Sequence, residues 1–329
     1  MMDEWLDFLR CPNTGFKLEL DGSGNLVTAD GRYQYSVSFG IPDLRVFEPP
    51  YMSREEEIKI AGELYDAAKT KNYNQLVEYF ESVLLGDRPR EVIDKGIAHR
   101  LKLRERSPNR LKNILSEGSA LIPYGALLDL GCGSGEAVAE LINFGAQSVI
   151  GVDISLTELV LARKLLDEAG IDVCLVAACA EAMPFCNEYF DFVYSPDVIE
   201  HVSNQDLYLN EINRILQQNG IALLNSPNRY SLVCPEPHVG IWGLTYLPRP
   251  WVDPVCRALG KGAYVGKRLL SKVELKRLLS KNFNNFQLIS RLANPQSNSW
   301  IGKLYYSLSP WSEKIFSYVA DQHIVVAKK

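Results

Sequence analysis

The sequence lacks the features that mark secreted, membrane-spanning or fibrous proteins. Its seven cysteines form no C-x-x-C pair, which favours free thiols in a reducing compartment over a disulfide framework. No uninterrupted apolar run is long enough to cross a bilayer. The acidic Asp3, Glu4 and Asp7 argue against a secretory signal in the first ten residues. We therefore expect a cytoplasmic protein with no integral membrane association.

Strong net charge is also absent. The formal charge of -5 counts against a broad nucleic-acid-binding surface, so no nucleic-acid partner is expected. The 329 residues have the composition of a globular protein and suffice for a catalytic domain with additions. Nothing in the composition specifies an oligomeric state.

The most informative segment is an apolar run that ends in an acid and three alternating glycines. It reads Asp129-x-Gly131-x-Gly133-x-Gly135, directly after a predicted buried strand. Glycines let the backbone approach a ligand that a Cβ atom would displace. The next predicted strand ends in Asp153, where a carboxylate can accept both hydroxyls of a ribose. The two segments predict a nucleoside-containing cofactor across the ends of two parallel strands.

The glycine spacing differs from the G-x-G-x-x-G of dinucleotide-binding folds and resembles motif I of the class I S-adenosylmethionine-dependent methyltransferases. This resemblance implies that Asp129 and the glycines hold the methionine end of the cofactor, and that Asp153 holds its ribose. Ala180–Phe185 is similar to the family's segment beside the adenine, with Cys179 where the family usually has an aspartate. The predicted cofactor-binding residues are Asp129, Gly131, Cys132, Gly133, Gly135, Asp153, Ile154, Ala180, Glu181 and Ser195.

Strand and helix patterns alternate after residue 125, which is typical of a parallel sheet covered on both faces. We predict an α/β fold with a Rossmann-like seven-stranded sheet, and the family resemblance implies that the last strand is antiparallel. The predicted strands are 126–131, 148–154, 172–178, 190–195, 220–226, 286–292 and 322–328. The predicted helices are 134–144, 155–169, 205–217 and 271–281.

Three regions are predicted along the chain. Residues 1–48 have short strand candidates at 18–20, 26–28 and 33–37, and they resemble a small zinc-ribbon domain. Of that family's two cysteine pairs only Cys11 is present, so we expect a degenerate, metal-free unit that packs against the rest or supports a lid.

Residues 49–120 read as a helical cap, whose basic run from His99 to Arg106 is expected on a solvated helix face. Residues 121–329 form the methyltransferase domain, with two aromatic inserts at 228–268 and 293–319 that suit substrate recognition.

The fourth predicted strand runs into Asp197-x-x-Glu200-His201, which places two carboxylates and an imidazole close together. This resembles the acid-x-x-Glu-His motif of ubiquinone-pathway (type 11) methyltransferases and of small-RNA 2′-O-methyltransferases, where it binds a divalent cation. His238 would be a further ligand. Three interpretations stay open: a cation such as Mg²⁺ or Mn²⁺ bound by Asp197, Glu200, His201 and His238; His201 as general base; or a structural role.

The first insert adds candidate acceptor-binding residues. His238, Trp242, Tyr246 and Arg249 are expected in an aromatic lid, with Arg249 or Arg268 meeting an acidic group; packing of this insert on the N-terminal helices is the alternative. We predict an S-adenosylmethionine-dependent enzyme that methylates an oxygen of a small metabolite, either a secondary metabolite or a lipid-like or quinone-like compound. RNA methylation, N- or C-methylation and a non-catalytic scaffold are the alternatives.

Overall fold

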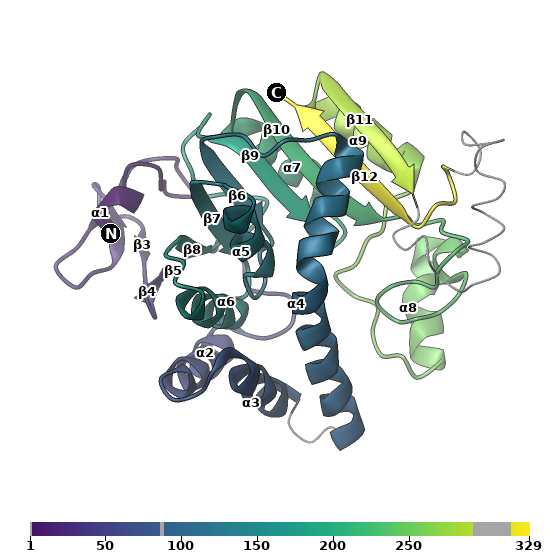
Figure 1. Ribbon diagram of the computed structural model, residues 1–329, viewed down its shortest axis with the longest axis horizontal. Coiled ribbons are helices and arrows are strands. Elements are labelled where there is room, and N and C mark those ends of the chain that lie inside the picture. The colour runs from purple at the N-terminus through teal and green to yellow at the C-terminus, as the bar shows by residue number, and fades with distance from the viewer. Residues whose placement is uncertain (1, 86–88, 292–316) are drawn as a thin grey trace.

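The computed structural model describes residues 2–85, 89–291 and 317–329. Its centre is one seven-stranded sheet of order β11-β12-β10-β9-β6-β7-β8 (Figure 1). Its strands are β6 (Ala126–Leu130), β7 (Ser148–Asp153), β8 (Cys174–Ala177), β9 (Phe190–Pro196), β10 (Leu216–Pro227), β11 (Asn285–Arg291) and β12 (Gln322–Lys328). β12 is antiparallel to both of its neighbours, and the strands from β10 to β8 are mutually parallel. The predicted fold class and all seven predicted strands are confirmed.

β10 begins earlier than predicted. Leu216 already pairs with Phe190 of β9, and the register then shifts before Ile221 pairs with Phe192. The polar residues between these two points hid this extension from the sequence pattern, since alternation is the signal by which a strand is predicted. The predicted strand 286–292 ends one residue outside the described part of the chain.

The four predicted helices that connect these strands are also present. They are α5 (Glu136–Asn143), α6 (Leu156–Glu168), α7 (Gln205–Ile215) and α9 (Lys272–Asn282). Side-chain caps define three of their starts: the Ser155 hydroxyl accepts from Glu158 N, and the Asn204 amide oxygen accepts from Asp206 N. Ser271 and Glu274 form a reciprocal capping box on α9. Such caps satisfy N–H groups that have no partner within the helix.

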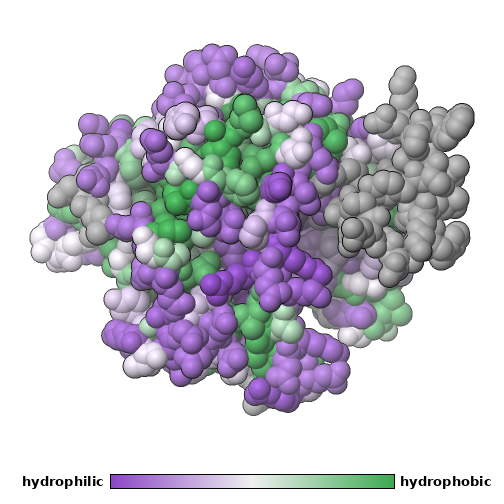
Figure 2. Space-filling view, viewed as in Figure 1, coloured by the Kyte–Doolittle hydropathy of each residue, from purple (hydrophilic) through white to green (hydrophobic). Residues whose placement is uncertain are grey.

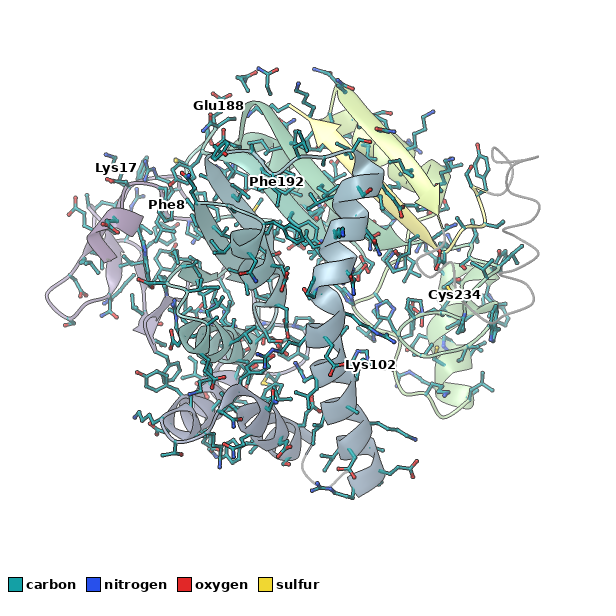
Figure 3. All side chains as sticks on the ribbon, viewed as in Figure 1. Phe8, Lys17, Lys102, Glu188, Phe192 and Cys234 are labelled. Carbon is teal, nitrogen blue, oxygen red and sulfur yellow. The ribbon has the colours of Figure 1, made fainter. Side chains whose placement is uncertain are left out.

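Alternate residues of the central strands enter two different cores. On β9, Phe192 and Tyr194 join the core under α4, α5 and α6, whereas Val193 between them joins the core under α7 and α9. Successive strand side chains point to opposite faces, so a strand covered on both sides reads as continuously apolar. Phe192 lies in this interior in Figure 3.

The N-terminal unit packs at the β8 edge of the sheet. It contains α1 (Met2–Trp5), β1 (Leu18–Leu20), β2 (Leu26–Thr28), β3 (Gln34–Tyr35), β4 (Val37–Ser38) and β5 (Ile41–Pro42), so the strand predicted at 33–37 is divided in two. Leu44 N donates to the Ala177 carbonyl, and Phe8 joins the core under α7 and α9 (Figure 3). The Cys11 Sγ lies 3.2 Å from the Tyr35 hydroxyl, which also accepts from Asn13. The thiol therefore sits in a contact between uncharged groups.

Three helices lie between the N-terminal unit and β6. They are α2 (Arg54–Ala68), α3 (Tyr73–Leu85) and α4 (Arg90–Gly118), and α4 begins after Pro89. Hydrophilic side chains cover most of the visible length of α4 in Figure 2. The expectation of a wholly solvated basic face was wrong for Arg100, which pairs with Glu81 of α3 and Glu158 of α6. Its guanidinium also lies over the Phe80 ring, so it joins three helices.

The first insert packs mainly on itself and on α9. It contains the 3₁₀ turn η1 (Leu244–Tyr246) and α8 (Arg249–Ala258), with a small apolar cluster of Leu244, Val252 and Cys256. The Glu274 carboxylate of α9 pairs with both Arg229 and Arg249. The insert therefore lies by α9 and away from α2 and α3 (Figure 1), contrary to the alternative that it packs on the N-terminal helices.

Residues 292–316, which include nearly all of the predicted insert 293–319, lie outside the described part of the chain. Within the described ranges, no helix has both the length and the apolarity that a membrane span requires.

Candidate active site

A cavity of about 520 Å³ opens at the carboxyl ends of the parallel strands β6, β7 and β9. Ligands of open α/β sheets bind at this edge, where loops leave neighbouring strands. Seven of the predicted site residues line the cavity: Gly131, Asp153, Ile154, Ala180, Glu181, Asp197 and His201. Phe47, Tyr51 and Phe80 add aromatic walls from the N-terminal segments, and sequence reasoning missed them because no motif marks them.

The glycine turn after β6 has a backbone that only glycine adopts easily. Gly131, Gly133 and Gly135 have φ values of +80°, +49° and +86°. A Cβ atom on Gly131 would lie 2.3 Å from a methyl group of Val198, a residue that lines the cavity. The motif therefore brings bare backbone to the wall of the cavity, as a tightly fitting ligand requires.

Asp153 ties this turn to the loop after β7. One carboxylate oxygen accepts from Gly133 N and the other from Ser155 N, each at 2.8 Å. A carboxylate oxygen has a second lone pair, so both oxygens can still accept from ribose hydroxyls in the cavity that Asp153 lines. Burial raises the pKa of Asp153 to about 6.

Asp129 is a buried carboxyl group without a partner. Neither of its oxygens has a hydrogen-bond partner among the described residues, and the residue is 1% exposed. Burial and the nearby Asp153 raise its pKa to about 8. A buried, unpaired polar group is costly, so such a group implies a missing partner. The α-ammonium of S-adenosylmethionine has the right charge to be this partner. Asp129 does not itself line the cavity, but its neighbours Leu130 and Gly131 do.

Three other predicted cofactor residues take different positions. Cys132 and Ser195 are buried and do not line the cavity; the Ser195 hydroxyl donates to the Leu130 carbonyl and accepts from Tyr208. They support the turn from behind. Glu181 lines the cavity, but one of its oxygens accepts from Ser203 N and Asn204 N. The Glu181 carboxylate thus connects the segment 180–185 to the start of α7.

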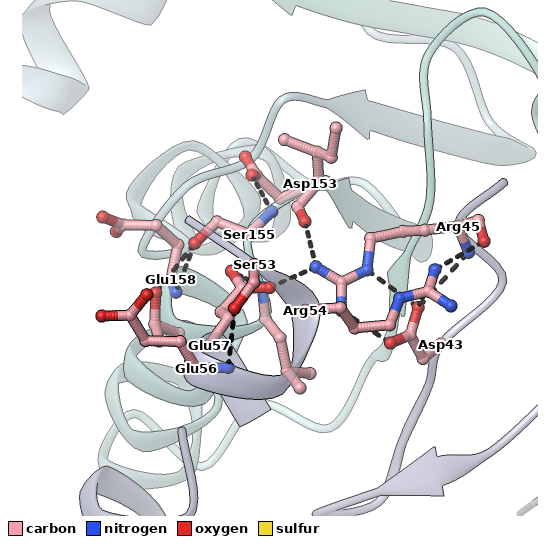
Figure 4. A network of polar contacts seen from close by, with 12 residues as sticks. Asp43, Arg45, Ser53, Arg54, Glu56, Glu57, Asp153, Ser155 and Glu158 are labelled. Carbon is pink, nitrogen blue, oxygen red and sulfur yellow. Dashed lines mark hydrogen bonds and ion pairs between the residues drawn. The ribbon is translucent and has the colours of Figure 1, made fainter. Parts of the chain in front are cut away.

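A buried ion network holds the loop after β7 from the N-terminal side (Figure 4). Arg45 and Glu57 are fully buried and paired, and Asp43 also pairs with Arg45. Arg45 donates to the Ile154 carbonyl, and Glu57 accepts from Leu156 N and from the Tyr51 hydroxyl. The two segments before α2 and at its start therefore position the backbone on both sides of residue 155.

The acceptor side of the cavity gathers Glu200, His201 and His238. One ligand atom from each lies within 4.8 Å of the others. The two Nε2 atoms of His201 and His238 are 3.3 Å apart, and the Glu236 carboxylate contacts His238 Nδ1 at 2.6 Å. Glu236 was not predicted, although its spacing of two residues from His238 was a usable signal. The insert thus completes a group that begins at the end of β9.

Asp197 does not join this group, in contrast to the predicted set of four ligands. Its carboxylate accepts from Arg110 of α4 and from the Asn225 amide. The backbone of Asp197 has φ of +54°, unusual for a residue other than glycine. Asp197 therefore links α4, β9 and β10 at the cavity wall, and no sequence signal pointed to Arg110 as its partner.

Electrostatics distinguishes the roles open to His201. Burial and the neighbouring His238 lower the pKa of His201 to about 4, so its imidazole is neutral at pH 7. General-base catalysis works best with a pKa near the working pH, and this shift is away from it. A neutral imidazole is also the form that binds a metal ion.

The remaining predicted acceptor residues lie outside the main cavity. Trp242 is 54% exposed, and the Tyr246 hydroxyl donates to the Tyr230 carbonyl. Arg249 donates to Glu274 and to the Leu269 carbonyl. Cys234 marks the position of this insert beside the sheet in Figure 3.

Comparison with known proteins agrees with the cofactor geometry. Residues 128–224 match the methyltransferase domain family. A ubiquinone biosynthesis O-methyltransferase of Brucella anthropi is 30% identical over 177 residues, which are 53% of this chain and 66% of that protein. The enzyme of the same name from Bartonella quintana is 29% identical over 184 residues, which are 55% of this chain and 70% of that protein. The matches thus span about two thirds of these relatives.

Solved structures with weaker likeness belong to the same class. Phosphoethanolamine N-methyltransferase 2 of Haemonchus contortus with S-adenosylmethionine has a TM-score of 0.46 and 19% identity, covering 67% of this chain and 52% of that chain. A possible histamine N-methyltransferase of Thermotoga maritima has a TM-score of 0.45 and 18% identity, covering 73% and 99%.

The sheet and the glycine turn define an α/β protein that binds a nucleoside cofactor at the carboxyl edge of its strands. With the sequence matches, the chain belongs to the class I S-adenosylmethionine-dependent methyltransferases.

The raised pKa of Asp129 predicts how cofactor affinity depends on pH. A bound ammonium group stabilises the carboxylate, so the bound-state pKa lies below the free-state value of about 8 and binding releases a proton below that pH. S-adenosylmethionine affinity should fall as pH decreases below 8, by up to about tenfold per unit, and should not rise above pH 8, where the ligand's own α-ammonium begins to lose its proton. Calorimetry between pH 6.5 and 8.5 measures this slope. Asp129→Asn should remove it, and equal affinity across the range in the parent protein would contradict the assignment.

The ion network predicts that Glu57→Gln weakens cofactor binding. The amide cannot accept from Arg45, Tyr51 and Leu156 N together, so the loop after β7 loses its support. We expect the dissociation constant of S-adenosylmethionine to rise by about tenfold, or ~1.4 kcal/mol. Glu55→Gln, an equal charge change on an exposed residue of the same helix turn, is the control. A lower melting temperature with unchanged cofactor affinity would show that the ion network stabilises the fold but does not support cofactor binding.

Proposed function

We propose that this methyltransferase transfers the methyl group to a hydroxyl oxygen of a small, largely apolar acceptor of the quinol or catechol type. The observation on which this depends is the group of Glu200, His201 and His238 beside the cofactor cavity. The two relatives named as ubiquinone biosynthesis O-methyltransferases support an oxygen acceptor. Aromatic walls at Phe47, Tyr51 and Phe80 suit flat ligands in this cavity.

Methyl transfer from a sulfonium to a hydroxyl requires alignment and removal of a proton. S-adenosylmethionine supplies an electrophilic methyl group when bound, and the displacement runs in line with its S–C bond. His201 lines the cavity, and its Nε2 lies 3.3 Å from His238 Nε2, so an acceptor hydroxyl would lie beside this pair. As its oxygen takes the methyl group, S-adenosylhomocysteine leaves and the hydroxyl proton passes to solvent. Glu236 holds His238 Nδ1 and thereby fixes which nitrogen faces the site.

We further propose that Glu200, His201 and His238 hold a divalent cation. One carboxylate and two imidazoles are a donor set found in transition-metal sites, whereas Mg²⁺ and Ca²⁺ prefer oxygen ligands. Glu236 behind His238 is the outer carboxylate that such a site usually has. When bound, the cation would lower the pKa of the acceptor hydroxyl. Asp197 is left out of the proposed ligand set because Arg110 and Asn225 already occupy its oxygens.

The atom that receives the methyl group gives a direct test of O-methylation. The purified chain is incubated with methyl-labelled S-adenosylmethionine and a series of catechols, and the product bond is identified by mass spectrometry and NMR. We expect an O-methyl product. Glu200→Gln and His201→Ala should lower kcat by at least about 100-fold while cofactor affinity stays within about twofold.

The exposed His99 provides the control, since His99→Ala makes the same change at a residue that does not line the cavity. Transfer to nitrogen or carbon, or full activity in both variants, would refute this proposal and leave the cofactor assignment intact.

Cation binding is tested with Mn²⁺, because free thiols would compete for Zn²⁺. After removal of bound metal by chelation, one Mn²⁺ per chain should bind in a calorimetric or spin-resonance titration, more tightly than Mg²⁺. Glu200→Gln and His238→Ala should each weaken it by at least about tenfold, as should Glu236→Gln. Cys11→Ser, in the N-terminal unit, should leave the stoichiometry unchanged. Binding that these site variants do not alter would exclude the proposed ligand set.

A further inference from the structure

A second, smaller cavity of about 220 Å³ lies within the insert and has a cationic wall. It is lined by Arg229, Thr245, Arg249, Val252, Asp253, Tyr264, Lys267, Arg268 and Leu269. Its volume suits a carboxylate or phosphate group with a few neighbouring atoms, and it is too small for the whole cofactor. Four basic side chains line this cavity. Neither cofactor binding nor the group of Glu200, His201 and His238 accounts for them.

The charges of this wall do not balance. Arg229 and Arg249 share the single carboxylate of Glu274, at 3.5 and 2.7 Å. The Asp253 carboxylate is taken by Arg257 Nε and by Tyr264 N. Within the described part of the chain, Lys267 and Arg268 make no ion pair with a carboxylate. Four basic side chains therefore line this cavity, against the Asp253 carboxylate in its wall and the Glu274 carboxylate beside it, and the excess positive potential favours an anion.

The second cavity adjoins the acceptor side of the first. Gly266 lines the main cavity, while Tyr264 and Lys267 on either side of it line the second. The Tyr264 hydroxyl donates to Glu236 at 2.8 Å, and Glu236 in turn contacts His238. The Arg268 amide donates to the Glu200 carbonyl at 2.7 Å. One short segment thus separates an anion-binding wall from the group that faces the acceptor hydroxyl.

We propose that this cationic cavity binds an anionic group, a carboxylate or a phosphate, of the methyl acceptor. This inference rests on the proposed function only in assigning the anion to the acceptor. An acceptor anchored there by its charge would extend past Gly266 and present a hydroxyl at His201. Lys267 and Arg268 are then specificity-determining residues, since no carboxylate among the described residues pairs with them and the Lys267 ammonium lies over the Tyr264 ring, 5.6 Å from its centroid.

The first experiment measures anion binding without turnover. Inorganic phosphate is titrated by calorimetry into the full chain saturated with S-adenosylhomocysteine. We expect saturable binding, weakened at least about tenfold in the double variant Lys267→Gln, Arg268→Gln. Lys261→Gln is the matched control, because Lys261 is exposed on the same segment and lines neither cavity. Lys267→Arg with Arg268→Lys, which keeps both charges, should retain binding and guards against loss of folding.

A second experiment asks whether the anion belongs to the acceptor. 3,4-Dihydroxybenzoate should bind the loaded protein at least about tenfold more tightly than the neutral 3,4-dihydroxybenzamide, and phosphate should displace it. The double variant should bind both equally.

Phosphate binding without displacement or preference would identify a site for a free anion and overturn the acceptor assignment. Absence of saturable phosphate binding, or binding that the double variant leaves unchanged, would overturn the site itself. Both experiments measure binding constants. Their results can therefore be judged even if the protein does not transfer a methyl group to oxygen.

Discussion

The hydrogen bond from Gly133 N to the Asp153 carboxylate is the constraint on which the site depends. It joins the turn after β6 to the end of β7, so the two halves of the cofactor crevice form one rigid edge. The turn can reach Asp153 only because glycines accept its positive φ values and because no Cβ atom meets Val198. Asp129, buried below, has no hydrogen-bond partner among the described residues.

Two segments outside the methyltransferase sheet complete the cavity. Before α2, Arg45 and Glu57 hold the loop after β7 through the Ile154 carbonyl and Leu156 N. After β10, the insert supplies His238 and its partner Glu236. Buried ion pairs of this kind contribute little net stability but fix geometry strictly, because an unpaired buried charge is so costly. The segment before α2 and the start of α2 therefore contact the loop after β7 that borders the cofactor cavity. The insert contacts His201 after β9.

The charges around the acceptor group show why local sequence is an incomplete guide. Asp197, Glu200 and His201 are neighbours in sequence, yet Arg110 of α4 draws Asp197 into a different contact. The basic run of α4 has the composition of a solvated face, yet Arg100 is paired with Glu81 and Glu158. Arg249 lines the second cavity and not the main one, and Glu274 of α9 holds it there. In each case a partner from a distant segment decides the role of the charge.

The amino-acid sequence by itself determined the strand and helix order, the glycine turn and the acid after the second strand. These follow from hydrophobic periodicity, from the backbone freedom of glycine and from short spacings, which are local properties. Only the tertiary structure decided that His238 meets His201, that Asp197 belongs to Arg110, and that Arg45 and Glu57 support the cofactor loop. Those contacts join residues far apart in the chain, and their energies depend on burial and distance, which no linear pattern contains.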